Sequence, residues 1–390
     1  MSGTHRLALV LALTPILGCG GTAPSDAGRP PASADPGPAR AVPPGSTTAQ
    51  ARVEAMVEAF VARGVFGAAS VALIVDQDTT YLAFGNRSRT DPRPPDERSF
   101  YEIGSITKVF TGLLLARMVE DGQVALDDPV AALLPPGTVV PTREEVAITL
   151  GHLTTHTSGL PRLADNMPAG DPRDPYADYT VRHLYAFLAG HALASRPGAS
   201  VTYSNVGVGL LGHALGRRDG RAWVGAIRAK VLDPLGLVDT TPTLSAEQRA
   251  RAVAGLGPAG AEVPTWTFTD ASAGAGALRS TARDLARWLR AELRPASSPL
   301  SASLARTQEP LVQGDDGRQV GHGWFLFDEG QVLFHNGGTG GFRAFVGAVP
   351  TEGRAVVLLA STTDPVTDAV GLAALAMLRG DPTRGPRPGP

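Results

Sequence analysis

Ser105 and Lys108 form a pair whose residue types and spacing can activate a nucleophile. They open a segment that runs through three leucines to about Asp121 and is followed by Gly122, which predicts a helix. Because positions i and i+3 share a helix face, the lysine amine can reach the serine hydroxyl. The helix N-terminus favours a developing alkoxide, and burial lowers a lysine pKa towards the range of a working base. The pair therefore predicts an activated serine.

Lysine is rare in this chain, which draws attention to Lys108. Of the 35 basic residues only two are lysine, Lys108 and Lys230, and the others are arginine. Arginine keeps its proton inside a protein, whereas a buried lysine can lose it. Lys230 lies in a helical stretch and is interpreted as a surface charge. Lys108 is therefore the candidate base.

Tyr203 and Asn205 supply a second element of the same chemistry. A phenol that is hydrogen-bonded to the serine can relay its proton, and a positive neighbour such as Lys108 lowers the cost of the phenolate. The Asn205 amide offers a donor and an acceptor, which suits it to hold the lysine and a substrate amide together. These residues are expected beside Ser105.

A glycine-rich segment from His335 to Gly341 follows a predicted strand that begins at Val332. Glycine lets a substrate approach the backbone closely, and a free N–H at Gly338 can pair with that of Ser105 as an oxyanion hole. Taken alone, the segment fits a flexible hairpin turn equally well. The presence of all three elements in this order favours a catalytic site.

Three short motifs of the chain resemble those of the serine β-lactamase-related superfamily, in the branch of class C β-lactamases, D-stereospecific peptidases and esterases. They are S-x-x-K at Ser105–Lys108, Y-x-N at Tyr203–Asn205 and H-x-G at His335–Gly337. The resemblance covers about residues 51 to 380. Its further blocks are Phe100–Gly104, Asp127–Val130, Leu153–Leu160, Pro234–Leu237 and Ser280–Leu285.

The resemblance implies a role for each of these residues. Ser105 is implied to be the acylated nucleophile, with Lys108 and Tyr203 sharing general acid–base catalysis. The remaining implied roles are substrate binding by Asn205, His335 and Gly337, and an oxyanion hole formed by the backbone N–H groups of Ser105 and Gly338. We expect no metal ion and no cofactor.

His335 departs from the family pattern, because penicillin-binding enzymes more often carry the lysine of K-T-G at this position. Neutral histidine attracts a substrate carboxylate less than lysine does. The departure weakens the case for an efficient β-lactamase and leaves esterase, amidase and D-amino-acid peptidase activities open. The alternative from another class is a non-catalytic protein that binds cell-wall peptides or acts as a scaffold. The intact set of Ser, Lys, Tyr and Asn argues against that alternative.

Three other patterns carry less weight. His152 and His156 have the i, i+4 spacing of a zinc pair but lack the interior Glu of a zinc protease motif. The G-x-G-x-x-G pattern at 207–212 does not follow a strand, so we expect it to serve close helix packing. Trp266 and Trp324 are candidates either for a substrate pocket or for ordinary packing.

The elements that must position the site come from both ends of the chain. A helix is expected over 51–63, and two short apolar runs at 68–75 and 81–84 are separated by a hairpin signature. Near the C-terminus, a closing helix is expected over 366–378. The strand patterns there cover 323–327, 332–335, 342–349 and 355–360.

Between these ends, the stretch from 106 to about 290 is mostly helical, with helix stops expected at Gly122, Gly216 and Gly236. We therefore predict an α+β fold: an antiparallel sheet built from both chain ends with flanking helices, plus an inserted, mostly helical lobe. The site is expected where the two parts meet.

The N-terminal segment predicts export and anchoring. An apolar run from Leu7 to Leu17 is too short to span a bilayer but suits the core of a signal peptide. It leads to Cys19, the only cysteine of the chain, in a context that resembles a bacterial lipoprotein signal whose cysteine is lipidated. The predicted divisions are a signal peptide at 1–18, a lipid-anchored Pro/Ala/Gly-rich linker at 19–50, the hydrolase domain at 51–380 and a disordered tail at 381–390.

Composition narrows the class of protein and its partners. With 35 basic and 37 acidic residues the net charge is −2, which lacks the positive excess of a nucleic-acid-binding protein. A hydrophobic content of 43% fits a sizeable core. The expected partners are a small-molecule or peptide substrate with a reactive carbonyl and, through Cys19, a membrane. The expected location is the bacterial cell envelope, on its periplasmic or extracellular face.

Overall fold

Residues 48–380 are described by the computed structural model, so the predictions for the signal peptide, for Cys19 and for the C-terminal tail lie outside the described residues. Within this range an eight-stranded antiparallel sheet has the order β2-β1-β12-β11-β10-β9-β8-β7. Its strands come from both chain ends, as the sequence predicts. They are β1 (Ala68–Val75), β2 (Asp78–Gly85), β7 (Val312–Gln313), β8 (Gln319–Val320), β9 (Phe325–Phe327), β10 (Val332–Gly338), β11 (Phe342–Val349) and β12 (Arg354–Ser361).

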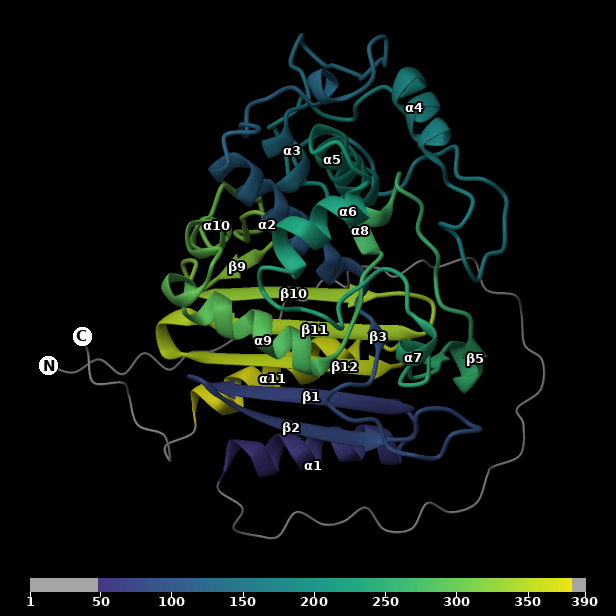
Figure 1. The fold of residues 1–390 in the computed structure, drawn as a ribbon, viewed down its shortest axis with the longest axis vertical. Helices are drawn as coiled ribbons and strands as arrows, with labels where there is room; N and C mark the ends of the chain where they lie inside the picture. The colour runs from purple at the N-terminus through teal and green to yellow at the C-terminus, as the bar shows by residue number, and fades with distance from the viewer. Residues whose placement is uncertain (1–47, 381–390) are drawn as a thin grey trace, which may run out of the picture. The chain divides into compact units, whose positions relative to one another are not determined.

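Both faces of this sheet are covered by helices. On β12, Val357 and Leu359 pack into the core shared with α9 (Ala282–Leu293), while Val356 and Leu358 pack against α1 (Ala49–Ala62) and α11 (Val366–Arg379). Helices α9 and α11 accordingly lie on opposite faces of the sheet (Figure 1). Because successive strand residues point to opposite faces, a strand buried on both sides reads as a continuous apolar run rather than an alternating one. This explains the apolar run at β12 and the nearly continuous one at β1, which Ser70 interrupts.

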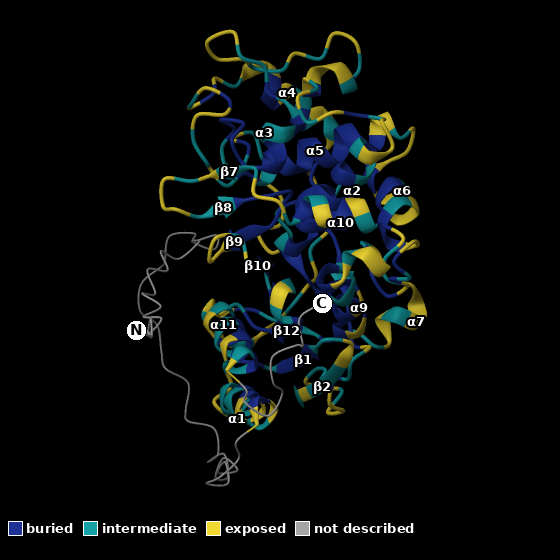
Figure 2. Cartoon of the chain, turned by 90° about the vertical axis from the view of Figure 1, so that its left-hand side faces the viewer, coloured by how far each residue is buried: buried dark blue, intermediate teal, exposed yellow. Residues whose placement is uncertain are grey.

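A mostly helical lobe is inserted between β2 and the C-terminal strands, which confirms the predicted architecture (Figure 1). Helices α2 and α5 form its centre and are buried along most of their length (Figure 2). Within residues 48–380, no helix is both long enough and apolar enough to cross a membrane. The lobe and its connections contain α2 (Thr107–Glu120), α3 (Leu150–Thr154), α4 (Val181–Gly190), α5 (Asn205–Arg218), α6 (Trp223–Ile227), α7 (Ala246–Arg249), α8 (Ala273–Gly276), α10 (Ser301–Thr307) and the short strand pairs β3 (Tyr101–Glu102) with β6 (Arg279–Ser280) and β4 (Gly255–Leu256) with β5 (Glu262–Val263).

The helix stop predicted at Gly216 is wrong. Helix α5 continues through this residue to Arg218, and the chain turns at Gly220, which has a φ of +74°. A Cβ atom at Gly216 would lie 2.6 Å from the backbone nitrogen of Trp223. This glycine therefore allows the chain after α5 to fold back against the helix. Gly122 does follow the end of α2, with a φ of +67°.

The G-x-G-x-x-G pattern serves helix packing, as predicted. A Cβ atom at Gly209 would lie 2.5 Å from the carbonyl oxygen of Ala271, and one at Gly212 would lie 2.9 Å from the Cα atom of Gly274. Because glycine has no side chain, the glycines on both helices let α8 lie directly against α5. The consequence for the site is that α8 brings the carbonyl group of Ala275 into contact with α2.

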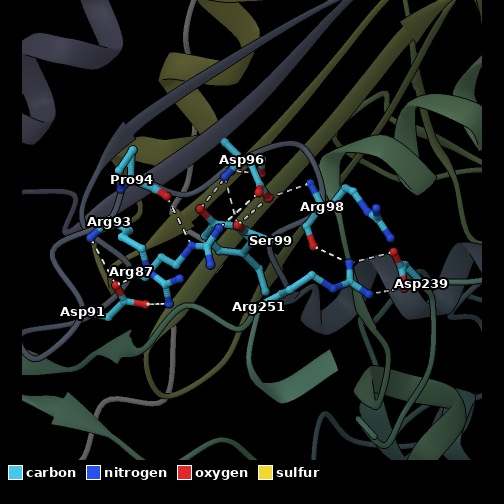
Figure 3. A network of polar contacts seen from close by, with 11 residues as sticks. Arg87, Asp91, Arg93, Pro94, Asp96, Arg98, Ser99, Asp239 and Arg251 are labelled. Atoms are coloured by element: carbon cyan, nitrogen blue, oxygen red, sulfur yellow. Dashed lines mark hydrogen bonds and ion pairs between the residues drawn. The ribbon is translucent and has the colours of Figure 1, made fainter. Parts of the chain in front are cut away.

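A network of ion pairs anchors the segment that leads from β2 into β3 (Figure 3). Arg87 pairs with Asp96 over 3.1 Å, and Arg251 makes two contacts of 2.8 Å with Asp239. The Arg251 guanidinium also donates to the carbonyl oxygen of Arg98 over 2.9 Å. Each partly exposed ion pair of this kind adds little to the free energy of unfolding. Together the pairs fix the position at which the chain enters β3 and the turn that follows it.

The close contact between α5 and α8 predicts a specific sensitivity to added volume. Gly209→Ala should lower the free energy of unfolding by about 1–3 kcal/mol, because the new methyl group meets backbone that cannot move aside cheaply. The matched control is Gly190→Ala at the end of α4, where a Cβ atom meets nothing within 4 Å. Urea unfolding of the two variants measures the difference, and equal stability would contradict the packing argument.

Candidate active site

Ser105 and Lys108 lie together at the start of α2, as their spacing predicts. Ser105 belongs to the single helical turn Gly104–Ile106, and Lys108 follows in the first turn of α2. The Lys108 Nζ atom lies 3.0 Å from Ser105 Oγ and donates to the carbonyl oxygen of Ala275 over 2.7 Å. Ser105 is partly exposed, whereas the lysine side chain is only 1% exposed. The hydroxyl therefore faces outward from a buried amine.

Burial sets the protonation state of this amine. It lowers the pKa of Lys108 well below the usual value, and the positive charge of Arg162 lowers it further. A neutral amine keeps N–H groups for the Ala275 carbonyl and has a lone pair for the Ser105 hydroxyl. The arrangement can thus take a proton from the serine.

Tyr203 completes the group around the serine. Its hydroxyl is hydrogen-bonded to Ser105, and its ring centre lies 4.9 Å from Lys108 Nζ. Burial raises the pKa of Tyr203 to about 12, although the bond to Ser105 and the charge of Arg162 act in the opposite direction. The phenol therefore holds its proton at neutral pH and is available as a proton donor.

The segment that carries Tyr203 is held by the loop 156–162. The Thr202 N–H donates to the carbonyl oxygen of His156 over 2.7 Å, and the Asn205 N–H donates to that of Arg162 over 2.9 Å. The His156 ring packs 4.5 Å from the Tyr203 ring, and its Nδ1 accepts from the Ser204 N–H over 3.2 Å. His156 is thus used as a structural acceptor. Within the described residues, no three His, Cys, Asp or Glu side chains gather as metal ligands.

Strand β10 packs its glycines directly on the turn that carries Ser105. A Cβ atom at Gly337 would clash with the carbonyl oxygen of Ile103, and one at Gly104 would lie 2.7 Å from the backbone nitrogen of Gly338. The Thr339 N–H donates to the carbonyl oxygen of Phe342 over 3.0 Å. Because N–H groups alternate in direction along an antiparallel strand, that of Gly338 points away from β11. Residues 335–338 are therefore ordered strand, and residues 339–341 form the hairpin connection between β10 and β11.

His335 is buried and neutral. Its Nδ1 bonds to the carbonyl oxygen of Asn336 over 2.6 Å, which makes this nitrogen the protonated one. Burial lowers the pKa of His335 to about 3, and the neighbouring Lys108 contributes in the same direction. Nε2 is buried and has no hydrogen-bond partner among the described residues, so it presents a lone pair.

Asn205 does not hold the lysine, contrary to the expectation from its position. Its Nδ2 donates to the hydroxyl of Tyr176 over 3.0 Å, and its Oδ1 is buried without a partner in the described range. The place beside Lys108 is taken by the Ala275 carbonyl, because α8 packs so closely on α5. Tyr176 itself stacks on Phe268 at 4.9 Å and packs on Trp266 at 5.6 Å.

Glu102 ties the surrounding segments together. Its carboxylate accepts from the backbone N–H of Trp266 over 2.7 Å, from Arg279 over 3.2 Å and from the Thr339 hydroxyl over 2.7 Å. Burial raises the pKa of Glu102, and the Arg279 charge opposes this shift. Trp266 is thereby fixed next to β10, with its Nε1 buried and unpartnered within residues 48–380. Trp324, by contrast, stacks on Trp288 in the core at 5.2 Å.

Sequence reasoning missed three contributors to this site: Arg162, Tyr176 and Ala275. A signal existed for Arg162, because it lies two residues beyond the block Leu153–Leu160. No pattern pointed to Ala275, which contributes a backbone carbonyl.

Comparison with known proteins agrees with this geometry. A family model described as Beta-lactamase matches residues 53–380. The chain belongs to the β-lactamase family. The protein is a serine hydrolase. This finding confirms the resemblance seen in the sequence and favours an enzyme over the non-catalytic alternative.

Relatives of this β-lactamase family member include peptidases and penicillin-binding proteins. It is 29% identical over 320 residues to the D-alanyl-D-alanine-carboxypeptidase/endopeptidase AmpH of Escherichia coli K12, covering 77% of this chain and 81% of the relative. It is 29% identical over 309 residues to penicillin-binding protein 4 of Amycolatopsis lactamdurans, covering 75% and 80%. The crystal structure of a β-lactamase/D-alanine carboxypeptidase from Yersinia pestis, complexed with citrate, matches with a TM-score of 0.73 at 26% identity, over 83% of this chain and 97% of that one.

The environment of His335 predicts that its ring stays neutral over the working pH range. Because the folded-state pKa is lowered to about 3, the ring should gain a proton only well below pH 5. Histidine NMR, with the signal assigned from a His335→Gln variant, should show no titration of this ring between pH 5 and 8. A midpoint near 6.5 would mean that the ring is solvated and can carry charge.

Proposed function

We propose that Ser105 is the nucleophile of this hydrolase and forms an acyl-enzyme with ester, amide or β-lactam carbonyl groups. The supporting observation is the buried Lys108 amine, 3.0 Å from Ser105 Oγ. A general base must lie within hydrogen-bond reach of the proton that it removes and must be unprotonated to accept it. Lys108 meets the first condition by position and the second by burial.

In the acylation step, Lys108 takes the Ser105 proton as Oγ forms a bond to the carbonyl carbon. The oxygen of the tetrahedral intermediate gains negative charge, and the backbone N–H groups of Ser105 and Gly338 are the proposed donors to it. Tyr203 then gives its proton to the leaving atom as the bond between the carbonyl carbon and that atom breaks. The proton on Lys108 passes to Tyr203, so both side chains return to their starting states.

In the deacylation step, water replaces the leaving group and attacks the acyl carbon. Tyr203 and Lys108 remove one proton from that water and return it to Ser105 Oγ as the ester bond breaks. The products are a free carboxylic acid and the original serine. This sequence needs neither a metal ion nor a cofactor.

For the substrate, we propose a peptide or related small molecule with a reactive carbonyl. The buried and unpartnered Asn205 Oδ1 can accept from a substrate N–H, and Trp266 Nε1 can donate to a substrate oxygen. Gly337 and His335 lie on β10, which packs on the turn that carries Ser105. The names of the relatives, a D-alanyl-D-alanine carboxypeptidase and a penicillin-binding protein, support a peptide-like substrate over a simple ester.

For location, we propose that the protein is exported to the bacterial cell envelope and anchored by a lipid on Cys19. The apolar run over 7–17 that leads to this single cysteine supports the proposal. The division into a signal peptide at 1–18, a linker at 19–50, a hydrolase domain at 51–380 and a tail at 381–390 belongs to the same proposal.

Covalent labelling tests the nucleophile. Ser105→Ala should abolish the mass increase seen by intact-protein mass spectrometry after brief exposure to a penicillin or a fluorophosphonate. Ser297→Ala, which changes an exposed serine elsewhere, should label like the wild type. Full labelling of the Ser105 variant would exclude this residue. With the wild type, a lasting penicillin adduct indicates a peptidase, and hydrolysis without an adduct indicates a β-lactamase.

Replacement of the lysine tests the base. Lys108→Arg should lower kcat/KM at least about 100-fold at pH 7, because arginine keeps a positive charge and cannot accept the serine proton. Lys230→Arg is the matched control, since that lysine pairs with Asp121 at the surface of the helical lobe. Near-normal turnover of the Lys108 variant would refute its role as the base. Circular dichroism of both variants verifies that they are folded.

A further inference from the structure

We propose that Arg162 binds a carboxylate on the leaving-group side of the substrate. This inference rests on the proposed function of Ser105 and Tyr203, and it narrows the substrate to acidic leaving groups. Arg162 was not among the residues that the sequence motifs selected.

The position of Arg162 places a cation beside the proposed proton donor. Its guanidinium carbon lies 5.1 Å from the centre of the Tyr203 ring, close to the 4.9 Å that separates Lys108 Nζ from the same centre. The Asn205 N–H donates to the Arg162 carbonyl over 2.9 Å, and the Ser204 hydroxyl donates to that of Pro161 over 2.6 Å. The backbone that carries the arginine is thus held against the segment that carries Tyr203.

The guanidinium of Arg162 has no counter-ion within residues 48–380. Two other partly buried arginines in that range do have one: Arg279 pairs with Glu102 over 3.2 Å, and Arg251 pairs with Asp239 over 2.8 Å. Charged side chains that are partly buried are normally paired with an opposite charge, because it costs free energy to remove an unpaired charge from water. An unpaired guanidinium beside reacting groups is suited to a negative group on a ligand.

The other basic groups near the site do not offer a positive charge to a substrate carboxylate. The buried amine of Lys108 serves as a neutral base, and His335 presents the lone pair of Nε2, which repels a carboxylate. Arg343 lies against Gly338, but on the sheet face opposite to Gly337, and donates there to the Thr363 carbonyl over 3.0 Å. Among the arginines near Tyr203, Arg162 is therefore the one positioned to meet a substrate.

The proton path indicates which half of the substrate carries the carboxylate. Tyr203 gives its proton to the leaving atom, so the leaving group must lie next to the Tyr203 hydroxyl. A carboxylate one or two bonds from that atom, as in the C-terminal residue of a peptide, then lies on the side of Arg162. A guanidinium can bind both of its oxygens at once. Peptides that lose a C-terminal amino acid and esters with an acidic alcohol fit this description.

A pair of matched esters tests the proposal. The two substrates are O-acetyl-D-lactate, whose leaving alcohol carries a carboxylate two bonds from the leaving oxygen, and the neutral O-acetyl-D-lactamide. The measured quantity is the ratio of their kcat/KM values. Arg162→Gln should lower this ratio about 10- to 100-fold, the range expected for loss of a charge-assisted hydrogen bond. Arg162→Lys should retain an intermediate ratio, because it keeps the charge but loses the planar fork.

The control removes the same charge at a distant surface. Arg93→Gln breaks an exposed pair with Asp91 in the network of Figure 3 and should leave the ratio at the wild-type value. Equal losses for both esters in Arg162→Gln would overturn the proposal and show that the arginine acts only through Tyr203. If the preference is instead seen between 4-nitrophenyl succinate and 4-nitrophenyl butyrate, the carboxylate lies on the acyl side and the leaving-group assignment is wrong.

A binding measurement separates this proposal from the proposed function. In the Ser105→Ala protein, calorimetry should show that N-acetyl-D-alanyl-D-alanine binds more tightly than its C-terminal amide. Adding Arg162→Gln should remove the difference, and equal binding of the two peptides before that change would overturn the role of Arg162. If the wild type hydrolyses neither ester, the proposed function is in question, while the binding result still decides on Arg162.

Discussion

A buried lysine amine is the constraint on which the rest of this site depends. Lys108 has Ser105 Oγ and the Ala275 carbonyl as hydrogen-bond partners and forms no ion pair within the described residues. A charged ammonium in such surroundings would cost several kcal/mol, so the fold favours the neutral form. The desolvation free energy that disfavours the charged form lowers the pKa of Lys108, and the resulting neutral amine can accept a proton. Closing the amine off from water requires α8 to lie against α5, which depends on glycines such as Gly209.

Close approach of backbone segments is the second requirement. Gly337 and Gly104 allow β10 to lie on the turn that carries Ser105, and a side chain at either position would separate the two. Glu102 then joins β3, the segment of Trp266 and the end of β10 through three hydrogen bonds. A rigid frame of this kind holds donors in place before a substrate arrives, which is the condition for effective stabilisation of a transition state.

The site retains polar atoms that the fold itself does not satisfy. Asn205 Oδ1, His335 Nε2 and Trp266 Nε1 are buried and lack partners in the described range, and the charge of Arg162 has no counter-ion there. Each unsatisfied buried group costs about 1–3 kcal/mol. Such groups are tolerated where a ligand satisfies them, which supports the proposed binding of a substrate at this site.

Features that depend on residues close together in the chain were predictable from the sequence. The Ser105 and Lys108 pair was predictable because helical spacing alone brings them together, and strands such as 342–349 were predictable from their apolar runs. The extension of the predicted strand 332–335 over Asn336–Gly338 was not, because pairing with β11 imposes it on a glycine-rich segment. The positions of Arg162 and Ala275 and the lowered pKa of His335 were decided by tertiary structure. They depend on contacts between segments far apart in the chain and on burial, which no local pattern encodes.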